Sequence, residues 1–445
     1  MLTPMNAGRP KRPVKRQPVR PELCPVVIGE KAFAFDPLTL EVYRVTLPLL
    51  RALDDAPHLL RPGPAPVFPD PGGFPSCSSL VINITHRCNL RCRYCFVREQ
   101  TVAKSREELD LPVEAALGAI RALCPDRVGF FGGEPMMRFD ALREIVEIVE
   151  KEFPKTRFSC TTNGTLIDDE AAAWFAARRD RCSFIVSLDG DPERHNQLRP
   201  LPDGDSHAGA LAGLRRLAEA GYRPTLRGTF TADGCDLAAE LEILNNLCDE
   251  GLGGHVSIEP VSLTEGCAFG RLAITPERMR AMEPMFMAAA DWFVARARAG
   301  KRARYHHLTK FIQRLYEKVP QCTECGAGRG YLTLSPDLSL HACHREKSRV
   351  GKLIGSENDW EIFFDNTARE AWRDNRLEVH ADCPSCPYRY LCGGGCRLDG
   401  IDQTGDVRRP DPANCELTRM RLRMAIRVID ALGITAAARA AGVAS

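Results

Sequence analysis

Short apolar, β-branched runs alternate with amphipathic segments through the middle of the chain. Each run has the length of a strand, and the segment after it repeats its apolar residues with a helical period. The predicted strands are residues 80–84, 127–131, 157–162, 182–187, 223–230 and 255–258, and two clear helices span 113–123 and 139–152. Strands that alternate with helices form parallel sheets with right-handed crossovers. Six such units fall short of the eight that close a barrel, so we expect an α/β fold with an open, partial (β/α)6 barrel.

The region before these strands has a different pattern. Residues 1–24 are rich in Pro, Arg and Lys and lack apolar periodicity, which predicts a disordered basic tail more than a nucleic-acid-binding arm. Residues 25–36 and 37–45 alternate around Asp36-Pro37 and predict a hairpin, and 47–53 predicts a helix. Residues 62–75 have the Pro and Gly content of a linker.

Polar residues gather where the predicted strands end. The carboxyl ends of parallel strands meet at one edge of a sheet, and ligands bind there. The residues in question are Gly132, Gly133, Glu134, Asn163, Ser187, Asp189, Arg227 and Glu259. A single Gly-Gly or Asp-Gly pair is more often a turn, but this many polar strand ends in register predict a binding site.

Three cysteines follow the first predicted strand, Cys88, Cys92 and Cys95 in the spacing C-x3-C-x2-C. A structural zinc site needs four ligands, and an electron-transfer cluster needs four cysteines. Three thiolates would leave one iron of a cluster open to another molecule. Simple core packing is disfavoured, because charged and polar residues surround the three thiols.

A second set of cysteines lies in the C-terminal third. Its members are Cys322, Cys325, Cys343, Cys383, Cys386, Cys392, Cys396 and Cys415. Eight thiolates can fully ligate two 4Fe-4S clusters, and two zinc sites would use the same number. Spacing alone therefore leaves both readings open. The other cysteines show no ligand spacing, and we expect most of them in the core.

Composition narrows the class of protein. The 445 residues are enough for two or three domains. Lys and Arg number 60 against 58 Asp and Glu, a net charge of +2, so no overall field attracts nucleic acid or a membrane. With no apolar run of membrane-spanning length and no signal peptide, a cytoplasmic protein is expected. Nineteen cysteines in a reducing compartment then indicate metal binding rather than disulfides.

Several segments together resemble the radical S-adenosylmethionine (SAM) enzymes that carry a SPASM extension. They are 85–96 with Tyr94, 130–135, 186–190, 227–231, 257–261 and 325–328. Among these enzymes the chain is similar to the SCIFF peptide thioether maturases and to the quinohaemoprotein amine dehydrogenase maturases. The resemblance implies a radical SAM core over 77–305, a SPASM domain over 306–430 and a C-terminal tail over 431–445. It also implies leader-peptide docking by the hairpin, helix and linker of 25–76, for which a structural lid over the barrel is the alternative.

The resemblance further implies three 4Fe-4S clusters, one that binds SAM at Cys88, Cys92 and Cys95, and two auxiliary ones. Cys383, Cys386, Cys392 and Cys415 would hold one auxiliary cluster, and Cys325, Cys343 and Cys396 the other. Cys322 would either complete the latter or leave an iron open to a substrate thiol. The residues implied to contact SAM are Tyr94, Gly132, Gly133, Glu134, Asn163, Ser187, Asp189 and Arg227.

The implied activity is hydrogen abstraction by a 5′-deoxyadenosyl radical from a ribosomally made peptide or protein substrate with a leader. A cysteine thioether crosslink is the expected product, and a carbon-carbon crosslink is the alternative. Oxidation of the sulfatase-maturase type ranks lower, because His344 stands where those enzymes have an aspartate. Flavodoxin or ferredoxin would supply electrons, and neither nucleic acid nor membrane is an expected partner. A non-enzymatic electron carrier or zinc scaffold leaves the polar strand ends unexplained.

Overall fold

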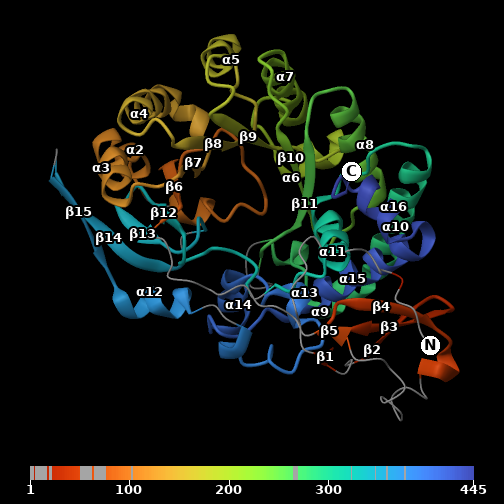
Figure 1. The fold of residues 1–445 in the computed structure, drawn as a ribbon. Coiled ribbons are helices and arrows are strands. Elements are labelled where there is room, and N and C mark those ends of the chain that lie inside the picture. The colour runs from red at the N-terminus through yellow and green to blue at the C-terminus, as the bar shows by residue number, and fades with distance from the viewer. Residues whose placement is uncertain are drawn as a thin grey trace.

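A curved sheet with helices on its outer side forms the body of the molecule (Figure 1). The structure is a computed structural model. It describes residues 5, 18–19, 23–50, 63–64, 77–101, 104–263, 269–321, 323–345, 347–356, 359–374 and 377–444.

Parallel strands alternate with helices as the sequence predicts. The strands are β6 (Ser79–Thr85), β7 (Arg127–Gly132), β8 (Arg157–Thr162), β9 (Cys182–Ser187), β10 (Thr225–Phe230) and β11 (His255–Pro260), each paired with the next. Helices α3 (Val113–Leu123), α4 (Phe139–Glu152), α5 (Asp169–Ala176), α7 (Ser206–Glu219) and α8 (Leu237–Asp249) cover the outer face (Figure 1). Two short helices, α2 (Arg106–Leu109) and α6 (Pro192–Leu198), lie in the connections. The prediction of an open, partial barrel is confirmed.

The sheet also continues past β6, which the sequence pattern did not predict. Strand β12 (Tyr331–Leu334) pairs in parallel with β6, and β13 (Ser339–His341), β14 (Arg349–Ser356) and β15 (Asp359–Phe364) follow in antiparallel order. Trp360 of β15 packs on α3 at Gly118, where an added Cβ would lie 2.3 Å from the indole Cγ. The C-terminal third is thus joined to the barrel through a shared sheet.

Helices complete the C-terminal third. They are α9 (Pro276–Ala281), α10 (Glu283–Arg298), α11 (His306–Glu317), α12 (Asn366–Arg373), α13 (Arg389–Cys392), α14 (Arg397–Thr404), α15 (Pro412–Leu432) and α16 (Ile434–Ala440). Helix α15 packs along α10 and α11. The segment expected as a C-terminal tail contains α16, whose Ala437 and Ala438 are buried. None of the described helices is long and apolar enough to cross a membrane.

The N-terminal unit is a three-stranded sheet of β2 (Cys24–Ile28), β3 (Lys31–Asp36) and β4 (Glu41–Val45), with β3 in the middle. The prediction of one hairpin bent at Asp36-Pro37 was therefore incomplete, because 25–36 is itself a hairpin. Gly29 makes this possible, since its φ of +57° lies in the left-handed region. Of the predicted helix 47–53, residues 47–50 are helical and the rest lies outside the described residues.

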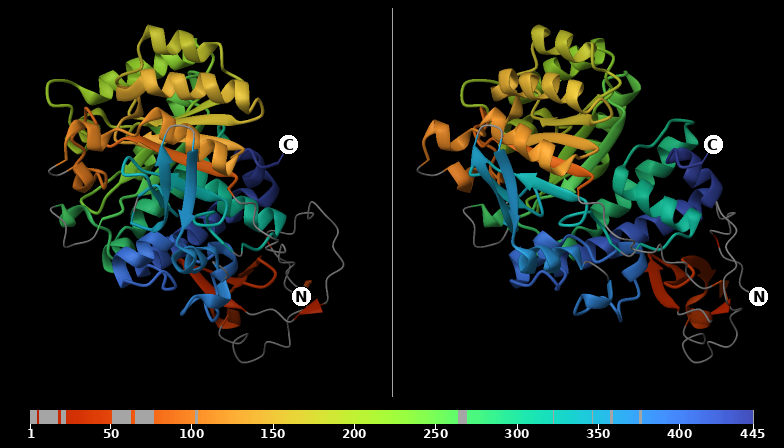
Figure 2. Two further views of the ribbon diagram at one scale, coloured as in Figure 1. Left: turned by 90° about the vertical axis from the view of Figure 1, so that its left-hand side faces the viewer. Right: turned by 60° about the vertical axis from the view of Figure 1, so that its left-hand side comes forward.

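The predicted basic tail and linker lie almost wholly outside the described residues. Within them, β1 (Pro18–Val19) pairs with β5 (Gly63–Pro64). Figure 2 shows the N-terminal sheet beside α15, at the end of the molecule away from the outer barrel helices.

Candidate active site

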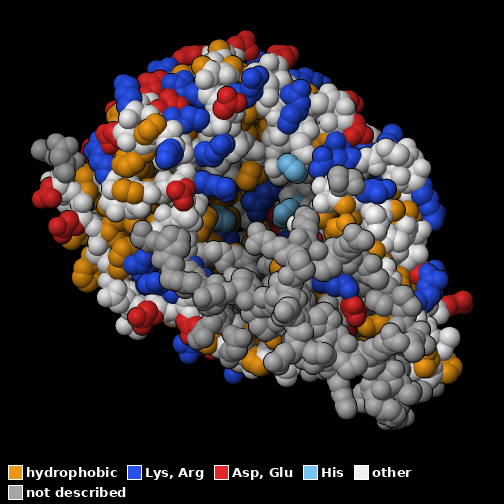
Figure 3. Space-filling model, in the orientation of Figure 1, with side chains coloured by type: hydrophobic (Ala, Val, Ile, Leu, Met, Phe, Trp, Pro, Cys, Tyr) orange, Lys and Arg blue, Asp and Glu red, His pale blue; other side chains and the backbone are white. Residues whose placement is uncertain are grey.

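A cavity of about 610 Å³ lies at the carboxyl ends of the barrel strands, between the barrel and the C-terminal third. Its lining comes from the loop after β6, from β7 to β11, and from α11, α14 and α15. Figure 3 shows this face hollowed at its centre, with cationic and histidine side chains in the hollow. A ligand in the cavity can touch both parts of the chain.

The thiols of Cys88, Cys92 and Cys95 line this cavity. Burial raises the pKa of Cys88 and of Cys92 to about 12, and the neighbouring thiols of the group add to the rise. Such thiols stay protonated unless a cation binds them, and an iron-sulfur cluster binds the deprotonated form. The donor set fits a cluster held by three cysteines.

Polar contacts on two sides hold the loop that carries these cysteines. The Arg87 guanidinium donates to both carboxylate oxygens of Asp110, at 2.9 and 2.8 Å. On the other side, the backbone N–H of Arg91 donates to the carbonyl of Pro200 at 2.9 Å. The loop lacks regular secondary structure, so these contacts fix where the thiols stand.

Gly132 is the last residue of β7 and Gly133 follows it, both directly against the same loop. An added Cβ on Gly133 would lie 2.1 Å from the Arg87 carbonyl oxygen, and one on Gly132 would lie 2.2 Å from that of Thr85. The Gly133 N–H donates to the Thr85 carbonyl at 2.7 Å. The sequence pattern was interpreted as room for a ligand. In the structure the glycines also let β7 pack on the cysteine loop.

Glu134 is a buried carboxylate whose partners carry no charge. It accepts from the Thr162 hydroxyl at 2.6 Å, from the Asn163 N–H at 2.7 Å and from the Met136 N–H at 3.1 Å. Burial raises its pKa to about 6, although these hydrogen bonds oppose the rise. Because Glu134 also lines the cavity, it can receive a cation there.

The other predicted SAM-contacting residues divide into two sets. Tyr94, Asn163, Ser187 and Arg227 line the cavity with Glu134. Asp189 is not among the lining residues. It is buried, and its carboxylate accepts from the Arg199 Nε at 2.9 Å.

Arg199 in turn stacks over the Tyr94 ring, 5.4 Å from its centroid. Asp189 therefore holds Arg199 against the cysteine loop. The sequence reasoning did not single out Arg199, which comes from the loop after α6 and has no motif spacing.

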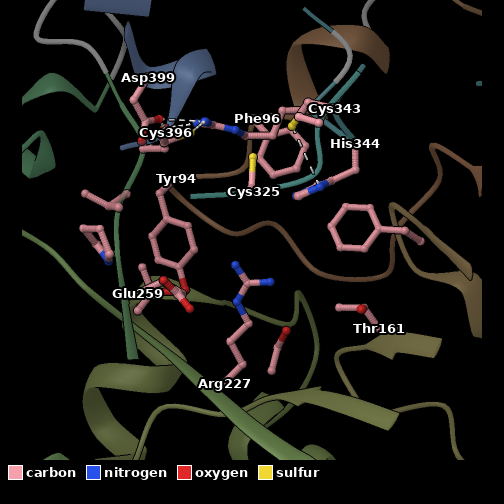
Figure 4. A pocket seen from close by; sticks show the side chains of 18 of the residues that line it. Tyr94, Phe96, Thr161, Arg227, Glu259, Cys325, Cys343, His344, Cys396 and Asp399 are labelled. Atoms are coloured by element: carbon pink, nitrogen blue, oxygen red, sulfur yellow. Dashed lines mark hydrogen bonds and ion pairs between the residues drawn. The ribbon is translucent and has the colours of Figure 1, made fainter. Parts of the chain in front are cut away.

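The opposite side of the cavity carries Glu259, at the end of β11, and His307, at the start of α11. The Glu259 carboxylate lies 2.8 Å from the His307 Nε2 and accepts from the Ser257 hydroxyl at 2.7 Å. Burial and the nearby Arg421 lower the pKa of His307 to about 4, so the ring is neutral at neutral pH. Figure 4 shows Glu259 and Arg227 directed into the cavity. The strand-end position indicated Glu259, whereas His307 had no sequence signal.

The C-terminal cysteines form two groups in space. The first auxiliary group is Cys325, Cys343 and Cys396, which line the cavity and interact electrostatically through Cys343. The second auxiliary group is Cys383, Cys386, Cys392 and Cys415. Burial raises the pKa of Cys383 and of Cys415 to about 12, and the neighbouring thiols add to the rise. Cys322 lies outside the described residues. Among the residues that are described, no three His, Cys, Asp or Glu side chains are placed to hold a single metal ion.

His344 lies between the barrel strands and the first auxiliary group (Figure 4). Its Nδ1 is 2.9 Å from the Tyr331 hydroxyl, and its ring packs edge-on to Phe131 with centroids 4.8 Å apart. Burial lowers its pKa to about 3, which makes it a neutral ring in the cavity wall.

Residues 82–234 match the family model of the radical SAM superfamily. The match covers the cysteine loop, the Gly-Gly-Glu segment and the strand ends of β6 to β10. The chain contains a radical SAM domain and is an enzyme. A radical SAM domain implies a 4Fe-4S cluster and SAM, which agrees with the three-thiol donor set.

Two curated relatives and one solved structure extend the comparison. A PqqA peptide cyclase from Granulibacter bethesdensis is 26% identical over 351 residues, 76% of this chain and 87% of that protein. An Fe-coproporphyrin III synthase from Methanosarcina barkeri is 27% identical over 360 residues, 76% of this chain and 88% of that protein. The fold is similar to native anSMEcpe with bound AdoMet and the Cp18Cys peptide, with a TM-score of 0.61, 17% identity, and coverage of 79% of this chain and 98% of that chain.

Proposed function

We propose that this radical SAM enzyme is a maturase that crosslinks a cysteine sulfur to a carbon atom within a ribosomally made peptide. The observation that carries the proposal is the shared cavity. Cys88, Cys92 and Cys95 line one part of it, and Cys325, Cys343 and Cys396 line another. A peptide segment in this space would contact both groups at once.

In this proposal the radical SAM core spans 77–305, and Cys88, Cys92 and Cys95 hold its cluster. When bound and reduced, that cluster supplies the electron that cleaves SAM to methionine and a 5′-deoxyadenosyl radical. Glu134 receives the ammonium group of SAM, because it is a buried carboxylate bonded only to uncharged groups. Asn163, Ser187 and Arg227 take the remaining polar groups of SAM from neighbouring strand ends.

The reaction balances as follows. Joining a C–H carbon to a thiol sulfur removes two hydrogens from the peptide. One leaves as a hydrogen atom to the adenosyl radical, and the other as a proton and an electron. The proton passes to a basic side chain of the cavity or to water.

The electron needs an acceptor close to the peptide. A 4Fe-4S cluster on the first auxiliary group would supply one, and a second on Cys383, Cys386, Cys392 and Cys415 would connect it to an external carrier such as flavodoxin or ferredoxin. The SPASM domain of this proposal spans 306–430.

Two comparisons support a peptide substrate. One relative is a peptide cyclase, and anSMEcpe was solved with a peptide bound. The second candidate is a carbon-carbon crosslink, which would also close a ring in a peptide, as the name of the cyclase relative indicates for that protein. The two candidates differ in what happens to the peptide cysteine, since only thioether formation consumes its thiol.

The first test is iron content. Anaerobically reconstituted protein should hold about twelve iron atoms, taking each cysteine group as one 4Fe-4S cluster. Changing Cys88, Cys92 and Cys95 together to Ala should remove about four iron atoms and abolish SAM cleavage. About four iron atoms in the unaltered protein would contradict the two auxiliary clusters.

The second test uses the product of a short cysteine-rich reading frame, to be sought beside the gene. Enzyme, reductant and SAM should yield a peptide that lacks two hydrogens and has one fewer thiol open to alkylation. Loss of hydrogens with all thiols retained would select the carbon-carbon crosslink. Fe-coproporphyrin III, the product named for another relative, serves as a comparison. Its formation from a tetrapyrrole precursor, without any peptide change, would overturn the peptide proposal.

A further inference from the structure

Arg345 lies between two thiols of the first auxiliary group. Its Nη2 donates to the Cys396 Sγ at 3.1 Å, and its side chain also donates to the Cys343 thiol. The residue is 9% exposed, so its charge acts at short range with little water to screen it. Figure 4 shows Cys396 and Asp399 together on one side of the cavity and Cys343 on another.

The guanidinium is held in place from elements far apart in the chain. Asp399 of α14 lies 2.7 Å from Nη2, and the Ser262 hydroxyl after β11 contacts Nη1. The Asn414 amide donates to the other Asp399 oxygen at 2.9 Å. Arg345 cannot turn away from the sulfurs without breaking these contacts. The fork geometry of arginine suits this arrangement better than a lysine would.

The second auxiliary group has a different cationic neighbour. Arg419 acts electrostatically on Cys415, but its guanidinium is paired with Glu416 at 2.7 Å, and its side chain is 45% exposed. Water and Glu416 therefore screen much of its charge. A second cation near this group, Arg314, is buried and acts on Cys392, but it is paired with Glu324 at 3.1 Å. Arg345 differs from both because it donates hydrogen bonds to the sulfurs of its own group.

We propose that Arg345 raises the reduction potential of the cluster held by the first auxiliary group and so makes it the electron acceptor for the peptide. Adding one electron to an iron-sulfur cluster increases the negative charge on its sulfurs. A buried cation and an N–H donor at those sulfurs stabilise the reduced form. Asp399 cancels part of the charge but leaves the N–H···S hydrogen bonds in place. This inference rests on the proposed function, because it requires the auxiliary clusters.

The test is a potentiometric titration of full-length protein in which Cys88, Cys92 and Cys95 are Ala, so that the auxiliary centres alone give signals. A mediated chemical reductant supplies the electrons, and electron paramagnetic resonance follows each centre. Arg345→Gln keeps donors but removes the charge, and it should shift the midpoint of one centre to a more negative potential. Arg419→Gln is the matched control and should leave the midpoint of that centre unchanged.

Arg345→Lys separates a tuning role from a structural one. It keeps the charge, so the centre should still form. Its midpoint potential should lie closer to that of the parent protein than the midpoint potential of Arg345→Gln does. Unchanged midpoint potentials in Arg345→Gln, or equal shifts in the potentials of both centres, would overturn this inference but not the proposed function. Loss of the first centre's iron in both variants would make Arg345 structural and also overturn it. A parent protein without about eight iron atoms would overturn the proposed function, and this inference with it.

Discussion

Two buried carboxylates near the cavity have different electrostatic surroundings. Glu134 is bonded only to uncharged groups, and burial raises its pKa to about 6. Burial also opposes the ionisation of Asp189, but the charge of Arg199 lowers its pKa below the ordinary value. The Asp189 charge is already neutralised within the protein, whereas that of Glu134 is not. Glu134 is thus the better partner for the ammonium group of SAM.

Glu134→Gln tests this assignment. The variant should bind SAM more weakly by about 1.5–3 kcal/mol, the usual contribution of a hydrogen bond to a charged group. Binding by the unaltered protein should weaken as the pH falls through about 6, because the carboxylate then becomes protonated. The variant should lack this part of the pH dependence.

Anaerobic equilibrium binding of SAM between pH 5 and 8 measures both effects, with iron content as the control for intact clusters. An affinity equal to that of the unaltered protein across this range would give Glu134 a purely structural role.

At the scale of elements, the hydrophobic pattern along the chain correctly predicted the strands that are covered on both faces. Strands β6 and β7 have apolar runs because helices cover one side and the barrel interior the other, whereas β8 and β10 alternate buried with half-buried residues. Strand β12 is short, and its place beside β6 depends on a partner far away in sequence. Sequence reasoning missed it for that reason. It also missed the local turn at Gly29, which joins β2 to β3.

In the candidate site, too, local sequence signals were informative and long-range packing was not visible in the sequence. Cysteines and strand ends carry spacing signals, so the sequence could place them. Arg199, His307 and Arg345 come from loops and a helix that tertiary packing brings to the cavity. Only Arg345 had a signal in the sequence, its position two residues after Cys343.

Gly133→Ala tests the packing of β7 on the cysteine loop. Its Cβ would lie 2.1 Å from the Arg87 carbonyl oxygen, a rigid backbone atom that cannot yield as a side chain would. We expect the loop to shift, about four iron atoms to be lost and SAM cleavage to cease.

Gly118→Ala is the control, since its added Cβ would crowd the Trp360 side chain and not the cysteine loop. It should lower stability to unfolding by about 1–3 kcal/mol while the iron content is retained. Full iron content in Gly133→Ala would show that the loop tolerates the displacement.

At the scale of the whole molecule, the N-terminal sheet touches the C-terminal third rather than the cavity. Lys31 pairs with Asp430 of α15 at 2.7 Å, Arg44 pairs with the same carboxylate, and Glu41 pairs with Lys318 at 2.7 Å. The Cys24 thiol lies 3.2 Å from the Tyr388 hydroxyl, next to the second auxiliary group. A leader peptide docked on this sheet would approach the cavity past the second auxiliary group.

Among the described strands, β2 and β4 are the outer ones of this sheet. The Met5 N–H already donates to the Val42 carbonyl of β4 at 2.6 Å, so β2 is the edge that a leader could extend by β-augmentation. The competing role is structural, as a cover for the end of α15. Removing residues 1–56 should, for a docking unit, leave peptide-independent SAM cleavage and iron content largely unchanged but abolish peptide modification.

The double variant Lys31→Ala/Arg44→Ala gives a milder form of the same test. It frees the sheet from Asp430, whose side chain is only 5% exposed and loses both cationic partners, so the free energy of unfolding is measured alongside. If the leader docks on this sheet and the sheet must be held in place, the variant should modify the peptide more slowly. SAM cleavage without the peptide should stay unchanged. The rates of 5′-deoxyadenosine formation and of crosslink formation, measured side by side, distinguish a docking role of the sheet from a structural one. If the deletion removes iron and both activities together, the sheet is structural and the leader must bind elsewhere.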